Sequence, residues 1–219
     1  MRRIVRGAVL AAAAAALAAG CGRDAAPKGA DFPARLTAAV LTSQDVPGDY
    51  LPAQPQSAFR GVVAHDQPCR RLLALADGYG LRDVPSRGTA FYRLDPGSTL
   101  TQQVFDAGSV RAGRTLDAAR RDAAGCTALR AKVGGAEMNL PQSPLKTPGL
   151  APADTLAVRF SAPAGPGRTL SYELIVHRNG DALLIVAQPG VVSPKAPSPA
   201  ADAAARAAAR LPGASKLSP

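Results

Sequence analysis

Three segments near the end of the chain alternate apolar and other residues with the two-residue period of a β-strand. They cover residues 156–160, 170–177 and 183–187, with Asn179-Gly180 between the last two. A two-residue Asn-Gly link favours a hairpin with a type I′ turn, and a hairpin requires antiparallel strands. Pairing Arg178 with Asp181 sets the expected register.

The rest of the chain adds a second hairpin and several helices. Residues 89–94 and 100–105 resemble strands, and Asp95-Pro96-Gly97-Ser98 between them is a turn sequence. A Pro-rich loop with a short strand near 137–140 is expected between residues 133 and 153. Helices are expected at 33–41, 68–76, 109–129 and 199–211, the last with Ser198 as N-cap. Because hairpin connections dominate, the predicted fold class is α+β, an antiparallel β-sheet packed by helices.

The N-terminus has the pattern of an export signal. Arg2, Arg3 and Arg6 precede an uncharged apolar run over residues 7–20, which is too short to span a bilayer. The run ends in Leu17-Ala18-Ala19-Gly20-Cys21, which resembles the lipobox of bacterial lipoproteins, with Ala18 where that motif usually has Leu. The resemblance implies that Cys21 receives a diacylglyceryl group. The alternatives are an ordinary signal peptide with a chance cysteine and a hydrophobic helix that is retained.

Lipidation at Cys21 divides the 219 residues into four parts. Residues 1–20 are the predicted signal peptide, and 21–32 the lipidated cysteine with a flexible tether. Residues 33–212 form a single α+β domain, and 213–219 a disordered tail. Because two acyl chains anchor a protein stably, we expect the domain at the outer face of the cytoplasmic membrane.

Two cysteines remain once Cys21 is assigned to lipid. In an oxidising compartment an even pair favours a disulfide, here between Cys69 and Cys126. Closing the long loop between them would stabilise the fold by roughly 4 kcal/mol in the chain-entropy model. Two free buried thiols are one alternative. A metal site with His65 is another, but it lacks a fourth ligand at useful spacing.

The order of these features resembles a known family. Residues 36–50, LTAAVLTSQDVPGDY, resemble the opening "helix, then DLPxGY" of actinobacterial envelope lipoproteins with a PknH-like extracytoplasmic sensor domain. The later features follow in the same order, from Pro68-Cys69 through a strand pair, a long helix ending in Cys126 and a hairpin to a terminal helix. The resemblance implies an antiparallel sheet with helices against it and a cleft that receives a ligand. The kinase sensor domains typically carry two disulfides, whereas this chain has one available pair.

Motifs of catalysis are weak in this chain. Ser143 and Lys146 match the S-x-x-K pattern of penicillin-recognising enzymes, but they lie in a Pro-rich segment without the partner motifs. His65-Asp66 could orient an imidazole for a nucleophile, but the sequence has no G-x-S-x-G nucleophile elbow. It also has neither a P-loop nor a G-x-G-x-x-G fingerprint. We therefore expect a non-enzymatic protein without a cofactor or a catalytic metal.

One face of the terminal hairpin mixes ionisable and apolar residues. The alternation places Glu173 and His177 on that face, and Arg159 on the neighbouring strand. Such a mixture is typical of a ligand cleft, so these three residues are the candidate binding residues for a small molecule, a lipid or a glycan. The alternative is an ordinary exposed sheet face with solvated charges.

A second candidate is a basic helix face. The formal charge is +10, and Arg111, Arg114 and Arg121 follow one side of the expected helix 109–129. Without tryptophan or interleaved aromatic residues we expect no nucleic acid partner. The face suits anionic headgroups, wall polymers or another envelope protein. The alternative is a solvent-exposed face that is rich in arginine.

Overall fold

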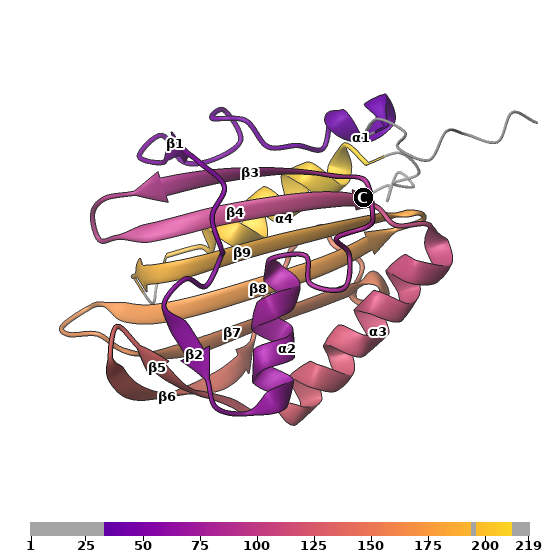
Figure 1. Cartoon of the computed structure of the whole chain (residues 1–219). Coiled ribbons are helices and arrows are strands. Elements are labelled where there is room, and N and C mark those ends of the chain that lie inside the picture. Colours follow the sequence, from indigo (N-terminus) through magenta and orange to yellow (C-terminus); the bar gives the residue numbers. More distant parts are fainter. Residues whose placement is uncertain (1–32, 194–195, 212–219) are drawn as a thin grey trace, which may run out of the picture.

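The computed structural model describes residues 33–193 and 196–211, and its centre is an antiparallel sheet (Figure 1). The described residues form nine strands, and each pairs antiparallel with its neighbours. From one edge to the other the order is β1 (Leu51–Ala53), β3 (Ser86–Arg93), β4 (Ser98–Asp106), β9 (Ala182–Val192), β8 (Thr169–Asn179), β7 (Thr155–Pro163), β6 (Ala136–Pro144), β5 (Ala128–Val133) and β2 (Val62–Ala64). The helices are α1 (Ala34–Thr37), α2 (Gln67–Ala76), α3 (Ser109–Gly125), the 3₁₀ turn η1 (Pro152–Asp154) and α4 (Pro199–Ala209). The predicted α+β class is confirmed.

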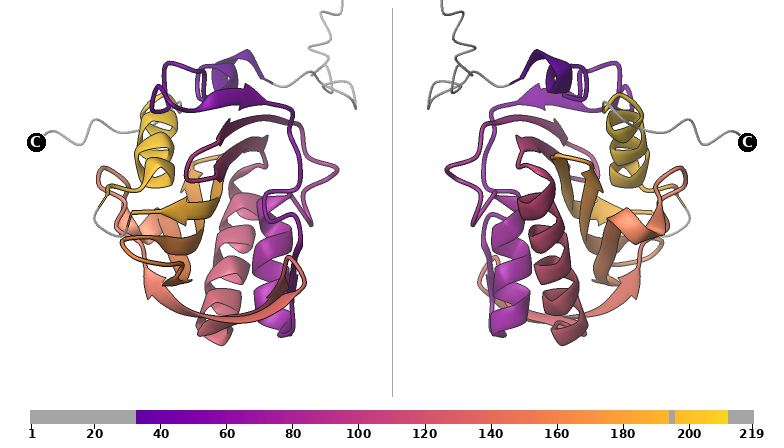
Figure 2. Two further views of the ribbon diagram at one scale, coloured as in Figure 1. Left: turned by 90° about the vertical axis from the view of Figure 1, so that its left-hand side faces the viewer. Right: turned by 90° about the vertical axis from the view of Figure 1, so that its right-hand side faces the viewer.

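Helices cover both faces of the sheet, as the two side views in Figure 2 show. One face packs against α2 and α3, and we call it the α2/α3 face. The opposite face packs against α4 and the segment 36–50, and we call it the α4 face. Along β8, Tyr172, Leu174 and Val176 belong to the first core, and Ile175 belongs to the second. The two-residue alternation of the sequence therefore separates two cores.

The predicted disulfide is present. It joins Cys69 on α2 to Cys126, and both residues are about 1% exposed. It ties α2 to the point where α3 ends, and Gly125 approaches Pro68 closely there. The bonded cysteines are not available as thiolates, so they do not form the alternative metal site with His65.

Several sequence predictions of secondary structure were wrong in extent. The helix expected at 109–129 ends at Gly125, and Cys126 is its C-cap rather than part of its buried stripe. Residues 128–133 are strand β5, because Leu129 and Ala131 alternate inward and pair with β6. The short strand predicted near 137–140 is part of β6, which is longer and includes Ser143 and Pro144.

The helix expected at 33–41 is reduced to the four residues of α1. The cause is a tertiary contact, since the Gln102 side chain on β4 satisfies the backbone that follows the helix. Its Nε2 donates to the Ala39 carbonyl at 2.7 Å, and its Oε1 accepts from the Leu41 amide at 2.8 Å. These backbone groups therefore bond to the sheet instead of continuing a helix.

The register of the β8–β9 hairpin also differs from the prediction. Asn179 pairs with Ala182 and Arg178 with Leu183, so the two-residue link is Gly180-Asp181. Gly180 adopts a φ of 57°, which glycine tolerates best. Each β8 residue therefore pairs with a β9 residue that lies two positions later in the sequence than expected. A two-residue shift keeps every side chain on its predicted face, whereas a one-residue shift would reverse them.

We predict that Asp45 makes stability dependent on acid pH. Its carboxylate is 7% exposed and accepts hydrogen bonds from Arg210 after α4 and from Thr42. The Arg210 hydrogen bond, with those from Thr42, lowers the pKa of Asp45 from 3.8 to about 2. A carboxyl group with a lowered folded-state pKa stabilises the fold above its unfolded value and loses that contribution as pH falls through the folded value.

Asp45→Asn should therefore lower the free energy of unfolding by roughly 2 kcal/mol at neutral pH. The difference from the wild type should disappear as the pH falls from about 4 to about 2. Urea denaturation of the full chain at several pH values measures it, with the exposed Asp202→Asn as control. A difference that is independent of pH would contradict the role of Asp45.

Candidate functional site: a cleft beside the strap

The helices leave part of the α2/α3 face uncovered. Strands β3, β4, β8 and β9 extend beyond α2 and α3 toward the β3–β4 connection, and the link from β1 to β2 crosses their face (Figure 1). We call residues 54–60 of this link the strap. Its sequence, Gln54-Pro55-Gln56-Ser57-Ala58-Phe59-Arg60, shows no periodic apolar pattern.

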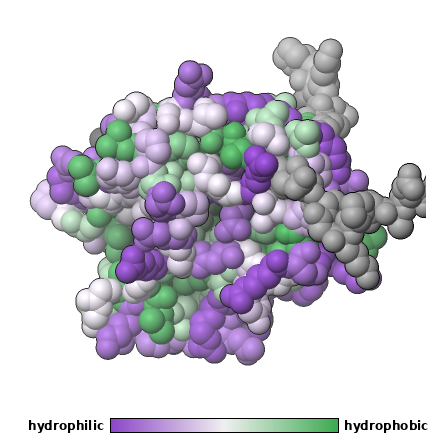
Figure 3. Space-filling view, turned by 45° about the horizontal axis from the view of Figure 1, so that its top comes forward, coloured by the Kyte–Doolittle hydropathy of each residue, from purple (hydrophilic) through white to green (hydrophobic). Residues whose placement is uncertain are grey.

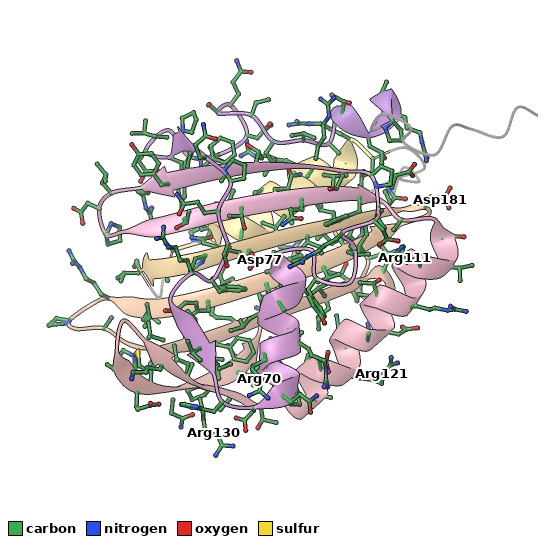
Figure 4. All side chains as sticks on the ribbon, in the orientation of Figure 1. Arg70, Asp77, Arg111, Arg121, Arg130 and Asp181 are labelled. Atoms are coloured by element: carbon green, nitrogen blue, oxygen red, sulfur yellow. A yellow bond between two sulfur atoms is a disulfide. The ribbon has the colours of Figure 1, made fainter. Side chains whose placement is uncertain are left out.

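The strap is held at its centre by α2 and by the sheet. Asp77 follows the last residue of α2, and Figure 4 labels it at that end. Its carboxylate accepts hydrogen bonds from the Ser57 hydroxyl and from the Ala58 amide, both at 2.6 Å. The Phe59 ring is buried and tilted against Tyr172 on β8, with ring centroids 5.9 Å apart. These contacts hold the strap across the sheet.

A cleft of about 710 Å³ lies between the strap and the uncovered sheet, and we call it the strap cleft. Strands β3, β4 and β8 contribute Ala90, Tyr92, Thr99, Thr101, Leu170 and Tyr172 to its lining. The β3–β4 connection and the end of β9 close one end with Leu94, Gly97, Pro189 and Gly190. A smaller pocket of about 280 Å³ adjoins it and shares Gln56 and Thr101 with it.

Gly190 shows how closely the backbone packs at that end. Its φ is 145°, and a Cβ atom at this position would overlap Ser98 on β4. Only glycine fits between these strands without displacing one of them. The shape of the cleft end therefore depends on a residue without a side chain.

The polar groups of the strap cleft are mostly neutral. The described lining residues include the arginines Arg60 and Arg93 but no Asp or Glu. Arg60 Nη1 donates to Gln56 Oε1 at 2.9 Å within the strap. Arg93 Nη1 donates to Asp49 at 3.2 Å, and its guanidinium lies over the Tyr50 ring, while its Nε is buried without a partner among the described residues.

Tyr172 is the most buried hydroxyl-bearing residue of the cleft lining. Its side chain is packed on Phe59, the residue is 5% exposed, and burial raises its pKa. Its hydroxyl makes no hydrogen bond to another described residue, and the same is true of Thr99, whereas Thr101 makes a long one of 3.4 Å to the Ala187 carbonyl. The floor of the cleft thus offers hydroxyl groups with free hydrogen-bonding capacity.

The three predicted binding residues lie on the opposite face of the sheet from this cleft. Arg159 Nε donates to Glu173 Oε1 at 2.8 Å, and Glu173 is 1% exposed. Glu173 also accepts a hydrogen bond from Ser198, the N-cap of α4. His177 is separate and bonds to Thr155 at 3.0 Å, and burial lowers its pKa. The structure thus joins Arg159 and Glu173 beneath α4, and their role in binding stays a prediction.

The predicted basic face lies along α3, where Figure 4 labels Arg111 and Arg121. Arg111 donates to both carboxylate oxygens of Asp83, at 2.7 and 2.6 Å, and to the Gly80 carbonyl. Arg114 lines a pocket of about 570 Å³ at the start of α3, together with Asp181. Arg121 is exposed. One of the three guanidinium groups is therefore already neutralised within the protein.

Among the described residues, exposed apolar side chains do not gather on one element. Those of large size are on β1, on β2, after α2, after β3 and on α3, namely Leu51, Val63, Tyr79, Leu94 and Val110. The face in Figure 3 accordingly mixes hydrophilic and hydrophobic patches. None of the helices in the described residues has the length and apolar character needed to cross a bilayer.

Three predicted segments cannot be compared with the structure. Cys21, the signal peptide at 1–20, the tether at 21–32 and the tail at 213–219 lie outside the described residues. The domain predicted at 33–212 contains all the described elements.

We predict that Asp77 holds the strap in place. Asp77→Ala removes the acceptor for Ser57 and Ala58, so residues 54–60 should exchange amide hydrogens faster and stability should fall by about 1 kcal/mol. Hydrogen–deuterium exchange of the full chain, followed by mass spectrometry of peptides, measures this. Asp117→Ala is the control, because its side chain is 63% exposed on α3. Unchanged exchange in the strap would show that Asp77 is not its anchor.

The similarity of this chain to a known protein is detected in its structure and not in its sequence. No family model matches this chain, and no curated protein matches it in sequence. Among solved structures, it is similar to the crystal structure of the extracellular domain of PknH from Mycobacterium tuberculosis, with a TM-score of 0.59 and 14% sequence identity. The match covers 81% of this chain and 94% of that domain. The chain thus shares the fold of the PknH extracellular domain, as its sequence predicted.

Proposed function

We propose that this protein is a lipid-anchored, extracytoplasmic, sensor-like domain that binds a ligand in the strap cleft without catalysing a reaction. The observation that carries the proposal is the cleft itself. Its volume of about 710 Å³ lies within the range of small-molecule sites, about 300–1,000 Å³. Its lining combines apolar and aromatic side chains with many polar ones, so it offers a ligand both apolar contact and hydrogen bonds.

The proposed location has three supports. The N-terminal arginines, the apolar run and Cys21 form a lipoprotein signal pattern. The Cys69–Cys126 disulfide is typical of oxidising compartments. The fold is that of a domain described as extracellular in PknH, which is consistent with the same side of the membrane.

The position of the cleft also suits a tethered domain. The described chain starts beside the end of β4, where Arg35 pairs with Asp106 at 2.7 Å. The cleft contains Ser98 and Thr99 at the start of the same strand. Nine residues of β-strand separate these ends by about 27 Å. A tether on the α1 side would therefore leave the cleft mouth away from the membrane.

The alternative function, docking of an envelope protein or an anionic polymer on Arg111, Arg114 and Arg121, has weaker support. Arg111 already donates three hydrogen bonds, to Asp83 and to the Gly80 carbonyl, so its charge is balanced and most of its donors are occupied. The cleft offers unpaired groups on a shaped surface, and we therefore favour it.

The anchor is tested by the intact mass of the full chain extracted from membranes. We expect a chain that begins at Cys21 and carries a diacylglyceryl group, because the lipobox directs that modification. Cys21→Ser should abolish the lipid and release the protein from membranes. A wild-type chain that starts elsewhere and lacks lipid would contradict the proposed anchor.

Ligand binding is tested by filling the cleft. Thr99→Trp places a large side chain on the cleft floor, whereas Thr127→Trp places one at an exposed turn before β5. The probes are a total polar-lipid extract and a digest of cell-wall glycans. At least one should raise the melting temperature of the wild type and of Thr127→Trp, but not that of Thr99→Trp. No shift with either probe, or an equal shift in Thr99→Trp, would overturn binding in the cleft.

A further inference from the structure

We infer that the strap cleft recognises an uncharged saccharide, through the Tyr172 hydroxyl and the threonines of the cleft floor. This inference rests on the proposed function, because it names the ligand class of the same cleft. It depends on three properties of the lining: its charge, its free hydroxyl groups and the position of its apolar surfaces.

The charge of the cleft favours a neutral ligand. A cationic ligand would need carboxylates, and the described lining residues include none. The Arg93 charge is balanced by Asp49 and lies over the Tyr50 ring. Arg60 is exposed on the strap and is bonded to Gln56, so an anion would meet only one exposed guanidinium there. Most of the available polar groups are uncharged hydroxyls and amides.

The hydroxyl groups favour a ligand rich in donors and acceptors. The Tyr172 side chain is largely buried, but its hydroxyl lines the cleft and has no hydrogen-bond partner among the described residues. A hydroxyl that faces the cleft without a protein partner can donate to one ligand oxygen and accept from another, so a ligand can bond to it without breaking a hydrogen bond of the protein. Thr99 and Thr101 lie on the same floor, opposite Tyr92 and Ala90 on β3. An acyl chain would leave these hydroxyls unpaired, which counts against a lipid tail.

The apolar surfaces lie beside these hydroxyls. Tyr92, Leu170 and Pro189 line the same cleft, and Pro189 is the cross-strand partner of Tyr172. A sugar ring has hydroxyls around its edge and C–H groups on its faces, so it can bond to the hydroxyls while a face packs on these side chains. The strap adds Gln54 and Gln56, whose amides both donate and accept. Among neutral ligands, a saccharide matches this mixture best.

The experiment measures binding of maltotriose, cellotriose and chitotriose to the full chain in detergent, by saturation-transfer NMR and calorimetry. Tyr172→Phe removes the hydroxyl and keeps the ring on Phe59. We expect at least one trisaccharide to bind the wild type, and Tyr172→Phe to bind it about tenfold more weakly, as for the loss of one hydrogen bond. Tyr79→Phe, which is exposed and outside the cleft, should bind as the wild type does.

Folding is checked separately, and Tyr172→Phe should melt no lower than the wild type because the hydroxyl has no partner to lose. Equal affinity of Tyr172→Phe and the wild type would overturn the inference. If no trisaccharide binds while the polar-lipid extract still stabilises the wild type and not Thr99→Trp, the saccharide inference fails and the proposed function stands. If neither class of probe binds, both fail.

Discussion

The β8–β9 hairpin organises the fold, because it is buried on both faces. Residues 171–177 of β8 and 182–188 of β9 are all buried. A sheet that is apolar on both sides must be covered twice, so α2 and α3 pack on one face and α4 on the other. The disulfide between Cys69 and Cys126 joins α2 to the end of α3 on the first of these faces. The strap cleft lies where this cover ends and the strands continue.

The packing of α4 on the α4 face depends on buried polar side chains of the sheet. Glu173 and Gln188 are cross-strand partners, and each is 1% exposed. Gln188 accepts from the Ala200 amide and donates to Tyr50, while Glu173 accepts from Ser198 and Arg159. These bonds satisfy the first turn of α4 and bring the segment before β1 onto the same face. The strand alternation places these ionisable residues on one face correctly, but a strand pattern does not show that α4 covers that face.

The strap cleft was missed because its parts are far apart in the sequence. It combines the strap, the β3–β4 connection and the ends of β8 and β9. Thr99 and Thr101 were placed on a strand correctly, yet a strand pattern does not say which part of a sheet face remains open. Phe59 and Asp77 carry no periodic signal, and their roles appear only when α2 and β8 come together. Free hydroxyls on the floor distinguish this cleft from an apolar gap.

Local sequence patterns predicted the α+β class, the hairpins, the faces of the strands in β8 and β9, and the cysteine pair correctly. Side-chain periodicity and turn residues act over short distances, so a local pattern is enough to predict strands and turns. The cysteine pair follows by elimination once Cys21 is predicted to carry the lipid. Tertiary structure decided where α1 and α3 end, the hairpin register and the location of the cleft. The end of α1 shows the reason, because Gln102 on a distant strand bonds to the backbone of Ala39 and Leu41 and competes there with the local helix preference. A sequence pattern does not contain that competition, because it arises only when the sheet has formed.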